Sequence, residues 1–307
     1  MHTSHTRATD ADDAFLIDPL HMTYEQTYNG YMNWFQNVTA TVPYMVTPGN
    51  HESECHSPAC VINHKEYGLP LSNFSAFNHR WSMPSVESGG HQHSNMWYSF
   101  NFGTVHYVSL NTETDFPGAG EEHTGDSGMK NLPAGGFGHK GEYLQWLEND
   151  LKQAAAARQS QTANARPWIV AIGHRPFKDI AETAGPLFSQ YGVDIYFAGH
   201  AHSYSRSSPA SATGHVDTDH DSKHLYKTPN GTVWIVAGGA GCDEMPEGSS
   251  SPHEDYLLDG DVSPEGSNVV KSKRYASGVL TANATALKWQ LIDSVDGTEL
   301  DHLTILK

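Results

Sequence analysis

The chain has 307 residues, of which 37% are hydrophobic, so it is long enough for one large domain with a complete core or for two smaller ones. Its formal net charge of -17 argues against nucleic acid or an anionic membrane surface as a partner, because proteins that bind polyanions carry a basic patch. No apolar run approaches the roughly 18 to 20 residues of a membrane-spanning helix, so we expect a soluble protein. The opening segment, Met1 to Asp13, is polar throughout and lacks the apolar stretch of a secretory leader.

The first predicted element is a helix over Met22 to Val38, where aromatic residues recur at helical spacing and are expected to face the core. A strand is predicted over Val42 to Thr47. Two more strands are predicted in "NMWYSFNFGTVHYVSLNTE", around a turn at Asn101 to Gly103. The clearest helix is predicted over Lys140 to Arg158, because its tyrosine and leucines fall on one side.

A strand, helix, strand pattern follows. It comprises "PWIVAIG" from Pro167, a short helix around Pro186 to Tyr191, and "VDIYFAG" from Val193. Continuous apolar strands separated by helices indicate a sheet that is buried on both faces. Later strands, predicted at "TVWIVAGG", "ASGVLTAN", "ALKWQLID" and "HLTILK", alternate in a way that suits a second, half-exposed sheet. The polar stretches 115–141, 207–230 and 247–273 are interpreted as surface excursions inside one domain.

The cysteines and sequons bear on the cellular compartment. Cys55, Cys60 and Cys242 are too few for a disulfide scaffold, although Cys55 and Cys60 can either close one small loop or remain free thiols. Four Asn-x-Ser/Thr sequons predict glycosylation and favour a secreted protein. They lie at Asn37, Asn73, Asn230 and Asn283.

Residues that can bind a metal follow three of the apolar runs, each time after a glycine. "PGNHE" supplies Asn50 and His51, "GHRPF" supplies His174, and "GHAHSYSR" supplies His200 and His202. Loops of this kind gather at the carboxyl edge of an open α/β sheet. One such dipeptide alone is more often ordinary turn chemistry. Nitrogen and oxygen ligands on all three loops, with two imidazoles two residues apart, predict a metal site.

These motifs carry a family resemblance. "GNHE", "GHRP" and "GHAHSYSR", with the strand pair "GTVHYVSLNTE" between the first two, resemble the motifs of the calcineurin-type metallophosphoesterases. Within them, "DIYFAGHAHSYSR" and "VAGGAGCDEM" are similar to fungal and plant purple acid phosphatases. The similarity runs from about Asp12 to the C-terminus. It implies an α/β fold in which two mixed β-sheets form a sandwich flanked by helices, with residues 1–307 as a single catalytic domain.

The resemblance also implies a chemistry. In that family a dinuclear centre, iron with Zn, Mn or Fe, clamps a phosphate ester while hydroxide attacks the phosphorus. By position, Asn50, His174 and His200 resemble the ligands of the divalent ion, and His202 resembles a ligand of the ferric ion. His51 resembles a histidine that hydrogen-bonds the phosphate or protonates the leaving oxygen. Glu52 is expected to orient a ligand. The implied enzyme is a secreted or vacuolar acid phosphatase that hydrolyses small phosphate monoesters.

Two family motifs are absent before "GNHE", namely Asp-x-Gly and Gly-Asp-x-x-Tyr, the second of which supplies the bridging carboxylate. "DADDAFL" resembles the end of the second motif, which puts Asp10 at the tyrosine position and Arg7 at the bridging aspartate. Since an arginine cannot bridge two cations, the first metal site is expected to be incomplete and the first βαβ portion of the fold to be missing. Arg175 or Lys178 is expected to contact the ester in place of histidines that other members carry.

Three hypotheses therefore stand. The chain is an active phosphatase whose remaining ligands come from a segment outside this sequence, or a non-catalytic relic that binds one metal ion or a phosphate. The third hypothesis is a phosphodiesterase that uses the same motifs. Comparison of monoester and diester substrates separates the first from the third.

Overall fold

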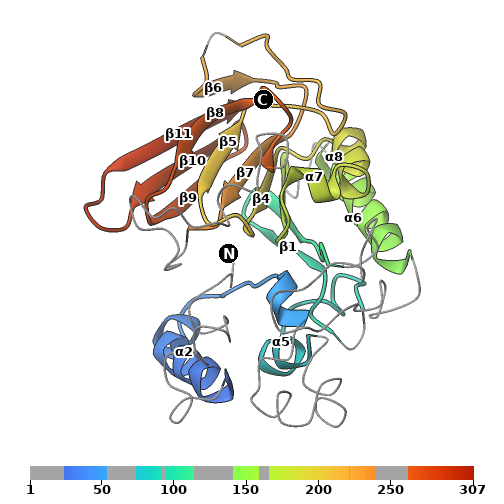
Figure 1. Ribbon diagram of the computed structural model, residues 1–307. Helices are drawn as coiled ribbons and strands as arrows, with labels where there is room; N and C mark the ends of the chain where they lie inside the picture. Colours follow the sequence, from blue (N-terminus) through green and yellow to red (C-terminus); the bar gives the residue numbers. More distant parts are fainter. Residues whose placement is uncertain are drawn as a thin grey trace.

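The computed structural model describes residues 24–53, 74–91, 94–113, 141–158, 166–220, 222–239 and 262–307. Two mixed β-sheets pack face to face, and helices cover the other face of the larger sheet (Figure 1). This arrangement confirms the predicted fold class. The cysteines and Asn73 lie outside the described residues, so the predictions made for them stay predictions, as does the assignment of residues 1–307 to one domain.

The larger sheet has seven strands in the order β1-β2-β3-β4-β7-β5-β8. Its strands are β1 (Tyr98–Phe102), β2 (Val105–Ser109), β3 (Trp168–Ile172), β4 (Ile195–Ala198), β5 (Tyr204–Ser207), β7 (Val233–Ala237) and β8 (Asn268–Ser272). The four central strands β2, β3, β4 and β7 run parallel, whereas β1, β5 and β8 are antiparallel to their neighbours. The parallel strands are buried on both faces, as their continuous apolar sequences predicted.

The smaller sheet has four strands in the order β6-β11-β10-β9. They are β6 (Leu225–Lys227), β9 (Ala276–Ala282), β10 (Ala286–Asp293) and β11 (Glu299–Leu306). Along β10, Leu287, Trp289 and Leu291 are buried, while Lys288 and Gln290 between them are exposed. The predicted half-exposed second sheet is therefore confirmed for "ASGVLTAN", "ALKWQLID" and "HLTILK". The prediction is wrong for "TVWIVAGG", which forms β7 of the larger sheet and is buried between its parallel neighbour β4 and β5.

Alternate residues of the central strands feed two separate cores. Trp168 and Val170 of β3 pack with the smaller sheet, whereas Ile169 and Ala171 face the helices. The helices on that side are α6 (Glu142–Arg158), α7 (Phe177–Ile180) and α8 (Ala184–Tyr191), seen at the right of Figure 1. Both predicted helices in this region are confirmed, and α7 is an addition that the sequence pattern did not indicate.

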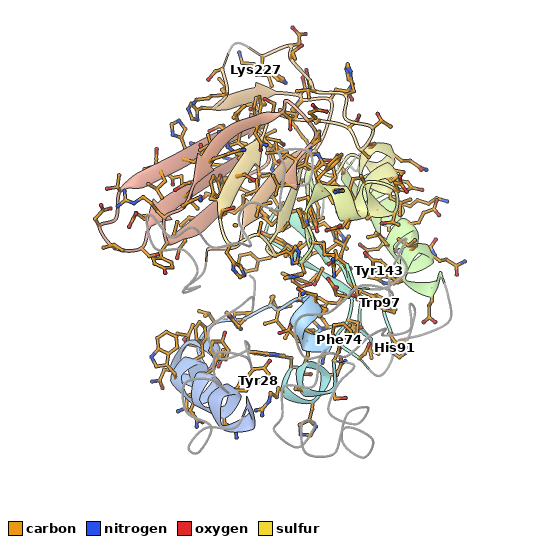
Figure 2. All side chains as sticks on the ribbon, viewed as in Figure 1. Tyr28, Phe74, His91, Trp97, Tyr143 and Lys227 are labelled. Atoms are coloured by element: carbon orange, nitrogen blue, oxygen red, sulfur yellow. The ribbon has the colours of Figure 1, made fainter. Side chains whose placement is uncertain are left out.

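A further group of elements lies below the sheets in Figure 1, comprising α2 (Tyr24–Thr39), the short 3₁₀ helix η1 (Asn50–Ser53) and α5 (Ser75–Arg80). Helix α2 confirms the predicted aromatic helix, and its Tyr28 is buried and accepts a hydrogen bond of 2.7 Å from Trp81 Nε1. Figure 2 shows Phe74, Trp97 and Tyr143 close together between α5 and α6, and the rings of Trp97 and Tyr143 lie 5.4 Å apart.

The predicted strand over Val42 to Thr47 is wrong, because no strand that the structure describes pairs with this segment. It is extended but held by side chains instead of a ladder. Tyr98 Oη donates to the carbonyl oxygen of Val46 at 2.6 Å, and Thr47 Oγ1 donates to that of Leu110 at 2.8 Å. These two bonds fix the segment that leads into Asn50.

Two of the predicted surface excursions also contain strands. β6 lies within 207–230 and β8 within 247–273, and β5 directly follows the His200 loop. These strands are short, and the sequences of β5 ("YSRS") and β8 ("NVVKS") lack an apolar run, so their pairing depends on neighbours. None of the helices in the described part of the chain has both the length and the apolarity to cross a bilayer.

Candidate metal centre

The parallel strands bring two of the predicted ligand loops together. The β3–β4 pairing continues past the strand ends, since Gly173 N donates to the carbonyl oxygen of Phe197 and Gly199 N donates to that of His174, each at 2.9 Å. His174 and His200 therefore emerge side by side at the carboxyl edge of the sheet. This edge is where the sequence predicted the ligands.

Three side chains converge there. Asn50 Oδ1 lies 2.6 Å from His174 Nε2, and His200 Nδ1 lies 3.1 Å from the same nitrogen. The two imidazole rings are 4.9 Å apart at 73°. His174 is fully buried and Asn50 nearly so, whereas His200 is half-buried and forms the side of the cluster nearest to solvent. The structure thus joins residues 124 positions apart in the sequence into one cluster.

The end of β2 holds the His174 loop. Thr112 Oγ1 accepts hydrogen bonds from the backbone N–H groups of His174, at 3.2 Å, and of Arg175, at 3.0 Å. The Arg175 guanidinium donates to both carboxylate oxygens of Glu113, and both side chains are only 5% exposed. This buried ion pair argues against the predicted contact between Arg175 and an ester, because that contact would leave Glu113 unpaired. Lys178 is exposed on α7, and its contact stays a prediction.

Gly49 and Glu52 fit closely around the cluster. Glu52 Oε2 accepts a hydrogen bond of 2.7 Å from Gly49 N, in the segment that leads into Asn50, and its predicted role in orienting a ligand stays a prediction. A Cβ atom at position 49 would lie 2.8 Å from His174 Nδ1 and 2.9 Å from His174 Cε1. Position 49 therefore has room for glycine alone unless His174 moves.

His200 has a positive φ of 55°, which is uncommon for a residue with a side chain. Its neighbours fix this conformation, since Gly199 N donates to the carbonyl oxygen of His174 and Ala201 N donates to that of Gly199 at 2.6 Å. Such conformations cost about 1 to 3 kcal/mol and concentrate at functional sites. The loop therefore holds His200 beside His174 in a backbone conformation that costs free energy.

Two predicted site residues are placed only in part. His202 lies two residues after His200 in the same loop, with a half-buried side chain. The backbone of His51 belongs to η1, but its side chain lies outside the described residues, as do Asp10 and Arg7. The predicted roles of His202 and His51 stay predictions.

The chemistry of the cluster fits one divalent metal ion. Asn50 Oδ1 can only accept a hydrogen bond. Without a metal ion, one proton on His174 Nε2 would be shared between Asn50 Oδ1 and His200 Nδ1. A divalent ion such as zinc would accept the lone pairs of all three atoms, so these residues would hold it in place of the shared proton. Across the described residues, no three or more His, Cys, Asp or Glu side chains form a group that could hold a metal ion.

A separate cavity of about 940 Å³ lies between α6, β1 and β2. Its lining includes Ser99, His106 and Asp150, and His106 Nε2 lies 2.8 Å from Asp150 Oδ2. None of the residues of the metal-ligand cluster lines this cavity. The cavity is therefore separate from the candidate metal site.

Two family models match the chain. Residues 12–204 match calcineurin-like phosphoesterase, and residues 231–302 match iron/zinc purple acid phosphatase-like protein C. The first range contains all the predicted ligands. The second contains most of the smaller sheet.

Curated relatives agree with these matches. An acid phosphatase of Aspergillus ficuum is 33% identical over 92% of this chain and 52% of its own length. Acid phosphatase type 7 of Homo sapiens is 28% identical over 90% of this chain and 56% of its own length. Probable purple acid phosphatase 20 of Arabidopsis thaliana is 31% identical over 64% of this chain and 40% of its own length. The chain spans about half the length of the curated relatives it matches.

A solved structure shows the same fold. A purple acid phosphatase from yellow lupin (Lupinus luteus) seeds superposes with a TM-score of 0.62 at 19% identity. The superposition covers 99% of this chain and 50% of the lupin chain.

Proposed function

Because the chain belongs to the calcineurin-like phosphoesterases, with a purple acid phosphatase-like C-terminal region, we propose that it hydrolyses phosphate monoesters at acid pH. The observation that carries the proposal is the convergence of Asn50 Oδ1, His174 Nε2 and His200 Nδ1. Nitrogen and oxygen donors of this kind suit Zn, Mn or Fe. The proposed substrates are small phosphate esters.

When bound, the metal ions of such a site polarise the phosphoryl oxygens and activate water. In this chain, Asn50, His174 and His200 would hold the divalent ion, and His202 would serve the iron position. Thr112 and Glu52 would keep the ligand loops in place through the backbone bonds that they accept.

His51 would donate the hydrogen bond or the proton that the reaction needs. By its place in "GNHE", directly after Asn50, it resembles the family histidine that hydrogen-bonds the phosphate or protonates the leaving oxygen. An acid setting also favours substrate approach, because protonation of the chain's 20 histidines offsets its net charge of -17. Asn37, Asn230 and Asn283 are exposed, which supports the proposal of a glycosylated protein in a secreted or vacuolar compartment.

The convergence of three donors also supports a second candidate function. Asn50, His174 and His200 together offer ligands for one metal ion. Such a site would bind a single metal ion, or a phosphate, without turning over an ester. This second candidate is a binding protein that retains the family fold.

The test is hydrolysis of p-nitrophenyl phosphate at about pH 5, where free histidine is protonated, with iron and zinc supplied. We expect a rate that His200→Ala abolishes and that His215→Ala, which removes an exposed histidine, leaves unchanged. Zinc binding by a folded chain with no rate would favour the second candidate. Faster hydrolysis of bis(p-nitrophenyl) phosphate would favour a phosphodiesterase.

A further inference from the structure

One buried carboxylate of the smaller sheet binds two side chains that directly follow the histidine loop. Asp301 of β11 accepts hydrogen bonds from Arg206 Nε at 2.6 Å, Arg206 Nη2 at 2.9 Å and Tyr204 Oη at 2.6 Å. The side chains of Arg206 and Asp301 are both 0% exposed. Tyr204 and Arg206 lie on β5, which starts two residues after His202.

Other bonds keep these groups in one geometry. Trp289 Nε1 donates to Tyr204 Oη at 3.0 Å, and Arg206 Nη1 donates to the carbonyl oxygen of Lys223 at 3.0 Å. The Tyr204 hydroxyl therefore donates to Asp301 and accepts from Trp289. Charge-assisted, two-point pairing of this kind fixes orientation as well as distance.

The loop from Gly199 to Ser203 is held at both of its ends. At its start, Gly199 N donates to the carbonyl oxygen of His174, and at its end Gly238 N donates to that of Ser203 at 3.0 Å. A Cβ atom at position 238 would lie 1.9 Å from the carbonyl oxygen of Ala201, so the loop has little room to shift toward β7. Because β5 begins directly after Ser203, the position of β5 fixes the end of this loop.

We propose that Asp301 is a positioning residue for the metal site, because it anchors Tyr204 and Arg206 and so fixes the loop that presents His200 to His174. This inference rests on the proposed function for the metal site itself. It gives the smaller sheet a part in metal binding, although none of the candidate ligands lies on that sheet.

The chemistry of the pair supports positioning over simple stabilisation. A buried ion pair is often no more stabilising than apolar side chains of the same size, but its hydrogen bonds are directional. Burial alone would raise the pKa of Asp301, yet the hydrogen bonds and charge of Arg206 and the bond from Tyr204 hold that pKa below its usual value. Asp301 therefore keeps its charge at the acid pH proposed for the reaction.

The test compares Asp301→Asn and Tyr204→Phe with Asp194→Asn. Asp194 is a matched control because it is also a buried carboxylate paired with an arginine, Arg158, but it lies before β4, at the opposite end from His200. The first measurement is amide hydrogen exchange of residues 199–203 in the metal-free protein. The second is zinc affinity, measured by competition with a chromophoric chelator.

We expect faster exchange of 199–203 in Asp301→Asn and Tyr204→Phe but not in Asp194→Asn, and zinc affinity about tenfold lower in the first two. Wild-type exchange or wild-type zinc affinity in both test variants would overturn the proposal. If Asp301→Asn does not fold, the result for Tyr204→Phe, which removes only one hydroxyl, decides whether the proposal holds. If the wild-type chain binds no zinc, the proposed metal site fails, and hydrogen exchange alone decides whether Asp301 anchors the loop.

Discussion

Substitution of Gly49 by alanine tests how tightly the ligand loops fit. The added Cβ would lie 2.8 Å from His174 Nδ1, 2.9 Å from His174 Cε1 and 3.1 Å from Glu52 Oε2. These separations are well below the optimum of about 3.5 to 4.0 Å for carbon contacts. The His174 ring is fully buried, and making room for the Cβ requires it to shift relative to Asn50 and His200.

The loss of stability expected for Gly49→Ala follows from this packing. Insertion of one carbon into a full core costs about 1 to 3 kcal/mol. Gly30 in α2 is a matched control because a Cβ there would meet nothing within 4 Å. Gly30→Ala should stabilise the protein by up to about 1 kcal/mol, the helix-propensity difference between the two residues. At about 2 to 4 °C per kcal/mol, the two variants should differ in Tm by several degrees.

Thermal unfolding followed by circular dichroism measures the first effect, and chelator competition measures zinc affinity. Gly49→Ala should lower both the Tm and the zinc affinity, the latter about tenfold, as for the loss of a group that orients a ligand. Gly30→Ala should retain wild-type zinc affinity. A Gly49→Ala protein with wild-type Tm and wild-type zinc affinity would refute the tight fit.

Three further outcomes are expected. Gly278→Ala should destabilise the protein by about 3 kcal/mol or more in urea unfolding, since its Cβ would lie 1.6 Å from Trp289 Cη2; a variant within error of wild type would contradict that packing. The folded-state pKa of Asp301 is lowered, so its contribution to stability is present above the usual carboxyl pKa of about 3.9 and is lost as pH falls through the folded value. The difference in unfolding free energy between wild type and Asp301→Asn should therefore shrink below about pH 4, and a constant difference would count against the lowered pKa. Asn283 is exposed in the turn between β9 and β10, so Asn283→Gln should remove one glycan from protein made in a secretory host, as read by mass spectrometry; an unchanged mass would show an unused sequon.

The metal-ligand cluster could be predicted because its signal is local. Asn50, His174 and His200 each follow a glycine at the end of an apolar run, and two of the loops extend from neighbouring parallel strands. The groups that hold the loops gave no such signal. Glu113 lies 62 residues from Arg175, and Asp301 lies 95 residues from Arg206, so only the folded chain reveals these pairs.

The sequence predicted a strand that does not form and missed a strand that does, and both errors have the same physical cause. Val46 and Thr47 belong to a β-type sequence, yet their segment has no ladder partner in the described structure and is fixed by Tyr98 and by the threonine hydroxyl. The polar segment Tyr204–Ser207 is a strand because β7 and β8 pair with its two edges. Arg206 can occupy that buried strand only because Asp301 neutralises it from the other sheet. Strand formation here is thus decided by the partners available to the backbone and to one charge, and propensity alone predicts the opposite for both segments.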